Sequence, residues 1–193
     1  VMKILAVIGS PRKRSNTTLL LNEFLAGARE QGAQAEVIRP FKMDIGPCIA
    51  CEGCYKTGRC VVKDDFQSVY DMILGSDALT LATPIYFGAV TAQVKSFIDR
   101  CQCFWAMRDV LRQPMPAGPA GAPRKGVLIA VAGVDRPEMF SGARITFDFL
   151  MRSLQGTVWA ELLYGGFDGG EEIRRDGAAL ASAREAGRRL AGG

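Results

Sequence analysis

Four of the six cysteines of this 193-residue chain stand in one short run with the spacing C-x₂-C-x₂-C-x₅-C: Cys48, Cys51, Cys54 and Cys60. Thiols at such close intervals can converge on one small centre, and the fourth can close it from the far side. Structural zinc sites usually take their ligands as two separated pairs, and the bacterial ferredoxin run C-x₂-C-x₂-C-x₃-C-P ends differently. This local set could complete one [4Fe–4S] cluster, while zinc, a redox-active disulfide and unligated thiols stay open as alternatives.

The chain contains no histidine, and this limits its chemistry. Ser-His-Asp hydrolysis, Cys-His proteolysis, His-ligated zinc and imidazole proton transfer are all excluded. Catalysis must come from thiols, hydroxyls, carboxylates, basic groups or a bound cofactor. The net charge of +4 is small and its basic residues are dispersed, so we expect no nucleic-acid partner.

A polar and basic loop over residues 9–17 leads from an apolar run into a helical pattern, where backbone N–H groups and the helix dipole favour an anion. The loop has neither G-x-G-x-x-G nor G-x-x-x-x-G-K-[ST], which excludes the dinucleotide and triphosphate fingerprints. The several donors of this loop suit a terminal phosphate dianion. If the loop served only to cap the helix, one of these donors would be enough. The candidate phosphate ligands are Ser10, Arg12, Ser15, Asn16 and Thr17, with Lys13 and Arg14 beside them.

A second loop, with two adjacent aromatic residues, follows a later apolar run at Thr83. Proline stops the strand there and glycine lets a backbone approach a flat partner. An aromatic pair after a strand is by itself more often core packing, but a phosphate loop one strand away favours a ring such as isoalloxazine. The candidate ring contacts are Pro84, Ile85, Tyr86, Phe87 and Gly88, with Gly133 donating backbone N–H groups to the pyrimidine edge.

These motifs resemble the flavodoxin-like NADPH-dependent FMN reductase family. The likeness rests on the stretch from Met2 to Arg12 with Ser15-Asn16-Thr17, on the Thr83–Gly88 turn, and on Gln93–Arg100. It runs from residue 2 to about 103 and implies that the first loop binds the FMN phosphate and the second lines the isoalloxazine. It further implies an NAD(P)H:acceptor reductase acting on free FMN or a quinone, with NAD(P)H stacking on the exposed flavin face.

The cysteine spacing resembles the iron–sulfur flavoprotein branch of the same family, in which a cluster held here by Cys48, Cys51, Cys54 and Cys60 would exchange single electrons with FMN. The acceptor would be a small molecule or a protein, and members commonly form homodimers or homotetramers. Tyr55, Phe104 and Trp105 are candidate walls around the nicotinamide, although core packing would also explain them. Two alternatives remain, a non-enzymatic electron carrier and a cysteine-loop redox sensor.

Five short apolar runs separated by helical patterns must position these loops. Strands are expected over 3–8, 35–39, 77–83, 126–132 and 157–164, and helices over 17–30, from Asp64 or Asp65 to Leu74, 90–103, 140–154 and 171–190. Alternation of this kind predicts an α/β fold, a flavodoxin-like doubly wound five-stranded parallel sheet of order 2-1-3-4-5 with helices on both faces. The ligand then lies at the carboxyl ends of the strands.

We expect a single flavodoxin-like FMN-binding domain over 1–193, with residues 41–63 as an inserted cysteine-rich loop. Cys101 and Cys103 are expected to be buried or idle thiols outside any second site. The first apolar run, Ile4–Ile8, is too short for a signal peptide, and no run is long enough to cross a membrane. The chain is therefore expected to be cytoplasmic, where structural disulfides are rare.

Overall fold

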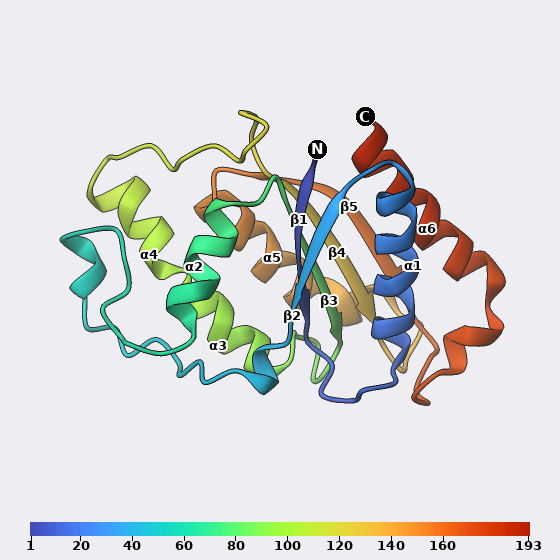
Figure 1. Cartoon of the computed structure of the whole chain (residues 1–193). Coiled ribbons are helices and arrows are strands. Elements are labelled where there is room, and N and C mark those ends of the chain that lie inside the picture. The colour runs from blue at the N-terminus through green and yellow to red at the C-terminus, as the bar shows by residue number, and fades with distance from the viewer.

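The apolar runs form one parallel sheet in the computed structural model, which describes all residues from 1 to 193. Its strand order is β2-β1-β3-β4-β5, which confirms the predicted topology (Figure 1). The strands are β1 (Lys3–Ile8), β2 (Gln34–Ile38), β3 (Ala78–Pro84), β4 (Lys125–Val131) and β5 (Thr157–Tyr164). Neighbours run parallel throughout, so that their carboxyl ends meet along one edge.

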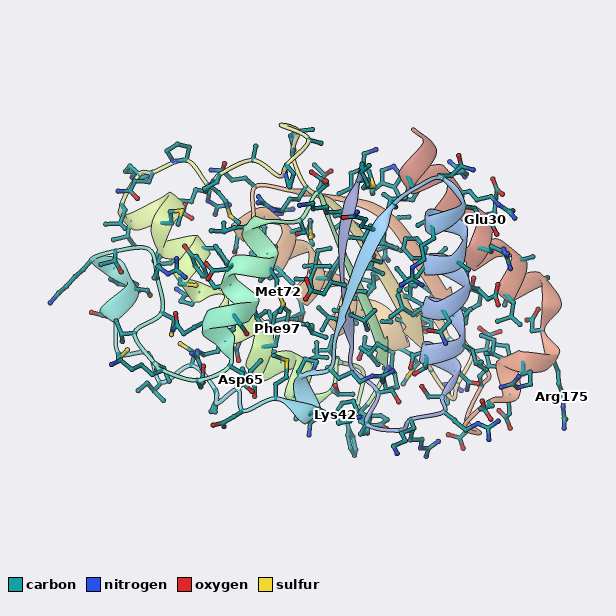
Figure 2. All side chains as sticks on the ribbon, in the orientation of Figure 1. Glu30, Lys42, Asp65, Met72, Phe97 and Arg175 are labelled. Carbon is teal, nitrogen blue, oxygen red and sulfur yellow. The ribbon has the colours of Figure 1, made fainter.

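Helices cover both faces of this sheet, which explains why its central strands read as unbroken apolar runs. One face carries α1 (Asn16–Glu30) and α6 (Gly177–Gly192). The other carries α2 (Phe66–Leu74), α3 (Ala92–Arg100), α4 (Gln102–Trp105) and α5 (Ser141–Ser153). In β1, Ile4 joins the core beneath α1 and α6, whereas Leu5 joins the core beneath the other helices. Side chains fill the space on both sides (Figure 2).

The contact between α1 and α6 brings two helix backbones unusually close. A Cβ atom on Gly187 would lie 1.9 Å from the carbonyl oxygen of Phe24, and one on Gly27 would lie 1.9 Å from that of Arg184. Glu30 at the end of α1 adds ion pairs to Arg184 and Arg188 of α6. The helix that begins at the phosphate loop is therefore held rigidly against the sheet and against α6.

Two helices differ from the prediction by more than two residues at one end. The expected helix over 90–103 begins at Ala92, because the Thr91 hydroxyl donates instead to the Gly9 carbonyl at 2.9 Å. Beyond the break at Cys101 it continues as α4 and a π-helical turn, Ala106–Val110. The final helix starts at Gly177 instead of 171, because the Asp176 side chain caps the amide of Ala179 and a separate 3₁₀ turn precedes it.

Candidate functional site

Most of the predicted phosphate and ring residues line one cavity of about 150 Å³ at the carboxyl edge of the sheet. The strand ends place the loops there, since the loop after β1 and the loop after β3 leave adjacent parallel strands. The predicted residues that the structure brings together at this flavin cavity are Ser10, Arg12, Ser15, Asn16, Thr17, Pro84, Ile85, Tyr86 and Gly133.

The amino end of α1 is shaped by hydroxyl groups. Ser15 adopts an extended backbone conformation, and its Oγ accepts a hydrogen bond from the amide of Thr18 at 3.2 Å. The same oxygen lies 3.0 Å from the Thr17 hydroxyl and 2.9 Å from that of Thr18. The amides of Asn16 and Thr17, in the first turn of α1, have no intrahelical acceptor and are therefore available to an anion.

The Asn16 side chain has a different role from the predicted one. Its Nδ2 donates to the carbonyl of Gly169 at 2.7 Å, and its Oδ1 accepts from the amide of Ile173 at 3.0 Å. Since these bonds use its polar atoms, the side chain ties the segment after β5 to the cavity. What Asn16 can still offer an anion is its backbone N–H.

The segment after β5 completes the flavin cavity and was missed by the sequence reasoning. Its lining residues are Phe167, Asp168, Gly169 and Gly170. The signal was available, because four glycines in 165–170 follow a strand whose carboxyl end lies on the same edge. An ion pair between Arg14 and Glu171 at 3.2 Å also ties this segment to the phosphate loop. Arg12 lines the cavity and supplies its positive charge.

The tip of the turn after β3 is not part of the cavity lining. Tyr86 and Ala89 exchange backbone hydrogen bonds of 3.0 and 3.1 Å, and Phe87 and Gly88 form the tip between them, outside the cavity lining. Phe87 has φ +51° and is fully exposed, so that a bulky residue holds a left-handed conformation without packing against the protein. The amides of Phe87 and Gly88 make no backbone hydrogen bond.

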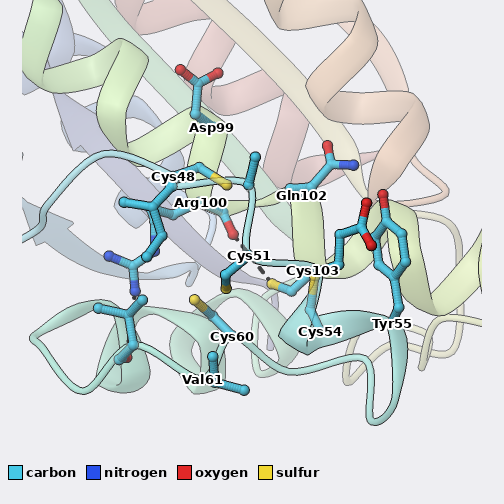
Figure 3. A pocket seen from close by; sticks show the side chains of 14 residues that line it. Cys48, Cys51, Cys54, Tyr55, Cys60, Val61, Asp99, Arg100, Gln102 and Cys103 are labelled. Carbon is cyan, nitrogen blue, oxygen red and sulfur yellow. Dashed lines mark hydrogen bonds between the residues drawn. The ribbon is translucent and has the colours of Figure 1, made fainter.

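The cysteine run lines a separate pocket of about 320 Å³. Figure 3 shows the side chains of Cys48, Cys51, Cys54 and Cys60 around it. Cys103 of α4 is buried as predicted, but it lies at the same pocket, a position that the sequence analysis did not predict. Cys101 is fully buried in the core, as predicted. No three Cys, Asp or Glu side chains stand close enough together to bind a single metal ion.

This cysteine pocket is desolvated on its inner side. Burial raises the pKa of Cys54 above its ordinary value, and burial together with Cys60 and Cys54 raises the pKa of Cys103 to about 12. Between the thiols, Ala50 and Glu52 have φ +51° and +57°. Two left-handed residues in three are a strained local conformation, of the kind that surrounding contacts must maintain.

Those contacts come mainly from α2. The Gln67 amide donates to the carbonyls of Cys60 and Val62 at 2.8 and 2.7 Å, and the Tyr70 hydroxyl donates to that of Gly58 at 3.2 Å. Tyr70 is itself stacked on Phe104, with ring centroids 4.6 Å apart. Phe104 is therefore a core residue and not a wall of a substrate site, whereas Trp105 remains partly exposed beside Tyr55.

An ion pair between Asp64 and Arg100 joins the inserted loop to α3. Both side chains are more than nine-tenths buried, and Arg100 reaches both carboxylate oxygens, at 2.5 and 3.0 Å. The sequence analysis placed Asp64 only at the start of a helix. It does accept from the amide of Phe66 at 3.0 Å, but its principal partner is the guanidinium.

The flavin cavity offers the donors that the suggested group requires, and the cysteine pocket offers the suggested ligand type, although its thiols do not converge on one point. The flavin cavity combines free helix amides, buried hydroxyls and an arginine, which are the donors a phosphate takes. The cysteine pocket presents four thiols over an apolar surface, and iron–sulfur centres are held by thiolates in partly desolvated sites.

Comparison with known proteins identifies a family and several relatives of this chain. The family model described as NADPH-dependent FMN reductase matches residues 2–136. An iron-sulfur flavoprotein of Archaeoglobus fulgidus is 34% identical over 141 residues, which are 73% of this chain and 60% of that protein. An iron-sulfur flavoprotein of Methanocaldococcus jannaschii is 38% identical over 99 residues, 51% of each chain. The matches thus span about half to three fifths of these relatives' length.

Solved structures extend the likeness over the whole chain. An NAD(P)H:quinone oxidoreductase from Methanothermobacter marburgensis superimposes with a TM-score of 0.69 at 21% identity, over 98% of this chain and 96% of that one. At such low identity the likeness concerns the fold. None of the helices combines the length and the apolar character that a membrane span needs.

Proposed function

The chain belongs to the NADPH-dependent FMN reductase family, and from this premise we propose that it is an FMN-dependent oxidoreductase. It takes electrons from NAD(P)H and passes them to a small-molecule acceptor such as a quinone or free flavin, or to a protein. The observation that carries this proposal is the flavin cavity itself. Residues from the loops after β1, β3, β4 and β5 line one cavity, with anion donors from one loop and apolar side chains from another.

The phosphate end of FMN would lie at the amino end of α1. There the amides of Asn16 and Thr17, the hydroxyls of Ser10 and Thr17, and the Arg12 guanidinium can each donate to a phosphate oxygen. The tether from Asn16 to the carbonyl of Gly169 would keep the segment after β5 closed over the ribityl chain.

The ring would lie against Pro84, Ile85 and Tyr86, where it meets apolar surface. When bound, FMN supplies the redox chemistry, since it takes up electrons in pairs and gives them out singly or in pairs. The amide of Phe87 or Gly88, free of backbone partners, would donate to flavin N5, and backbone donors near Gly133 would stabilise charge at N1 and O2. No side chain need act as acid or base, which agrees with a chain without histidine.

The cysteine pocket would hold one [4Fe–4S] cluster on Cys48, Cys51, Cys54 and Cys60. When bound, such a cluster supplies single-electron transfer. Support comes from the shared pocket of the four thiols and from relatives that bear the name iron-sulfur flavoprotein.

Steady-state oxidation of NADH and NADPH by the purified protein tests the function. With a quinone or ferricyanide as acceptor, we expect turnover that depends on bound FMN. Turnover only with a protein partner would assign an electron carrier instead, and no turnover with either would favour a cysteine-loop sensor.

Flavin retention tests the phosphate assignment. The triple variant S15A/N16A/T17A should release FMN, with affinity at least about 100-fold lower, because it removes the Thr17 hydroxyl donor, the Ser15 cap of α1 and the Asn16 tether together. The exposed Asn22→Ala change on the same helix is the matched control and should retain flavin. Unchanged flavin retention in the triple variant would rule the assignment out.

Metal analysis of anaerobically purified protein tests the cluster. We expect iron, acid-labile sulfide and absorbance near ~400 nm beyond that of flavin. Cys54→Ser should lose the iron and keep the FMN, while Cys101→Ala, which removes a thiol outside the pocket, should keep both. Stoichiometric zinc without iron would overturn the cluster.

We also propose a homodimer or homotetramer. The exposed tip at Phe87 is apolar surface that a second copy could cover, whereas the buried Phe104 cannot contribute. Light scattering of the eluting protein at several concentrations measures the assembly, and a monomer throughout would contradict this.

A further inference from the structure

Outside the flavin cavity, a buried arginine has one N–H group for which the protein provides no acceptor. Arg100 is 1% exposed, and four of its contacts go to Asp64 and to the carbonyls of Gly46 and Val62. These contacts occupy the two terminal nitrogens of the guanidinium. The remaining donor, Nε, is buried and has no acceptor. A buried N–H without a partner is costly, and natural structures rarely leave one unused.

This arginine forms part of the wall of the cysteine pocket, together with Cys60 (Figure 3). The carboxylate of Asp64 balances the charge of the buried Arg100 guanidinium, and Cys60 lies close enough to interact with that charge. The side chain thus stays charged beside the pocket, and Cys60 is the thiol within its reach.

The backbone on either side of Cys60 is fixed as well. Gln67 holds the carbonyls of Cys60 and Val62, and Arg100 itself contacts Val62 at 3.5 Å. The position of the sulfur relative to the guanidinium is therefore set by the fold. A neutral thiol is a weak acceptor, whereas a thiolate accepts strongly.

We propose that Arg100 is a positioning residue that donates its Nε–H to the sulfur of Cys60 when Cys60 is a thiolate ligand. The inference rests on the cluster in the proposed function and adds a role for this residue. A positive charge and a hydrogen bond at a ligand sulfur stabilise the more negative, reduced form of the centre, and so raise its reduction potential. Arg100 thereby makes the cluster easier to reduce.

A purely structural role would involve the same ion pair but would not move the potential. The test therefore uses Arg100→Lys, which keeps a charge and loses the planar donor, and D64N/R100Q, which removes the pair without stranding a charge. The control is D71N/R59Q, which removes the exposed ion pair between Arg59 and Asp71, next to the same loop.

The measurement is a redox titration of the anaerobically purified holoprotein, in which the potential of the bound FMN serves as an internal reference. We expect both Arg100 variants to lower the equilibrium constant for one-electron reduction of the cluster about tenfold, equivalent to about 59 mV, with the FMN potential unchanged. The control should not shift either potential.

Each other outcome counts against the inference. A cluster potential that stays at the wild-type value in both variants would overturn the role of Arg100 and leave the proposed function intact. Loss of iron from a folded Arg100→Lys protein that retains FMN would assign Arg100 to loop structure alone. Wild-type protein without iron would overturn the cluster and this inference together.

Discussion

The flavin cavity and the cysteine pocket are built in opposite ways. The flavin cavity is formed where regular strands and a long helix end, so that its geometry follows from the sheet. The cysteine pocket is formed by an irregular segment that lies beside α2 and α4 (Figure 1). Individual side chains of α2 hold this segment in place. The two have no lining residue in common. A change in one should therefore leave the other working.

The largest expected effect is at the ion pair that fastens the inserted loop. Asp64→Ala leaves the buried Arg100 charge without its partner, which should destabilise the protein by about 3–5 kcal/mol. Denaturant unfolding measures this. Asp71→Ala, which breaks the exposed pair with Arg59 in the same region, should cost less than about 1 kcal/mol. Equal losses in the two variants would mean that the buried pair does not fasten the loop.

A second change should affect only the flavin cavity. Asn16→Asp keeps the acceptor for Ile173 but loses the bond to Gly169 and places a negative charge where phosphate is expected. We expect FMN affinity to fall about 10- to 100-fold with iron content unchanged, because a lost hydrogen bond and a like charge add up to about 1.4–2.7 kcal/mol. Asn22→Asp, the same substitution at an exposed position of α1, should bind FMN normally.

Acid should lower the stability of the protein through Asp64, which lies beside the cysteine pocket. Burial alone would raise the pKa of Asp64, but the hydrogen bonds from Arg100, Phe66 and Gly46 hold it below its ordinary value of 3.8. A carboxylate whose pKa is lower in the folded state stabilises the fold fully above the unfolded value, and this stability is lost as pH falls through the folded value. We therefore expect wild-type stability to drop below pH 3.8.

The double variant D64N/R100Q isolates this contribution. Because it lacks both charges, its stability should change less with pH than that of the wild type in the same acid range. Unfolding followed at a series of pH values compares the two proteins. Parallel curves would mean that the pair contributes nothing to the acid response.

The smallest expected effect is at the tip of the turn after β3. Phe87→Gly removes a side chain that packs against nothing and relieves a left-handed backbone, so stability should rise by about 0.5–1 kcal/mol. If Phe87 covers the flavin, affinity for FMN should fall at the same time. Gln155→Gly, also at φ +51°, should give the stability gain with no change in FMN binding. Thermal unfolding and flavin titration separate the two effects.

Much of the fold and of the flavin cavity could be predicted from local sequence. Strand ends and helix starts depend on short stretches of sequence, so the start of α1 near residue 17 and the end of β3 at Pro84 could be placed from the chain alone. Parallel pairing then brings the carboxyl ends to one edge. The same reasoning passed over the segment at 167–170, because its glycines bind nothing until Asn16, about 150 positions earlier in the chain, ties them to the cavity.

The sequence by itself determined the strand order, the loops at the carboxyl edge and the spacing of the four thiols, because each depends on periodicity or on neighbours in the chain. Only the tertiary structure decided that Cys103 joins the cysteine pocket, that Asp64 pairs with Arg100 and that Arg100 keeps a free donor there. Those contacts join residues from separate elements, and burial makes them strong. No local pattern specifies which distant side chain will fill a desolvated position.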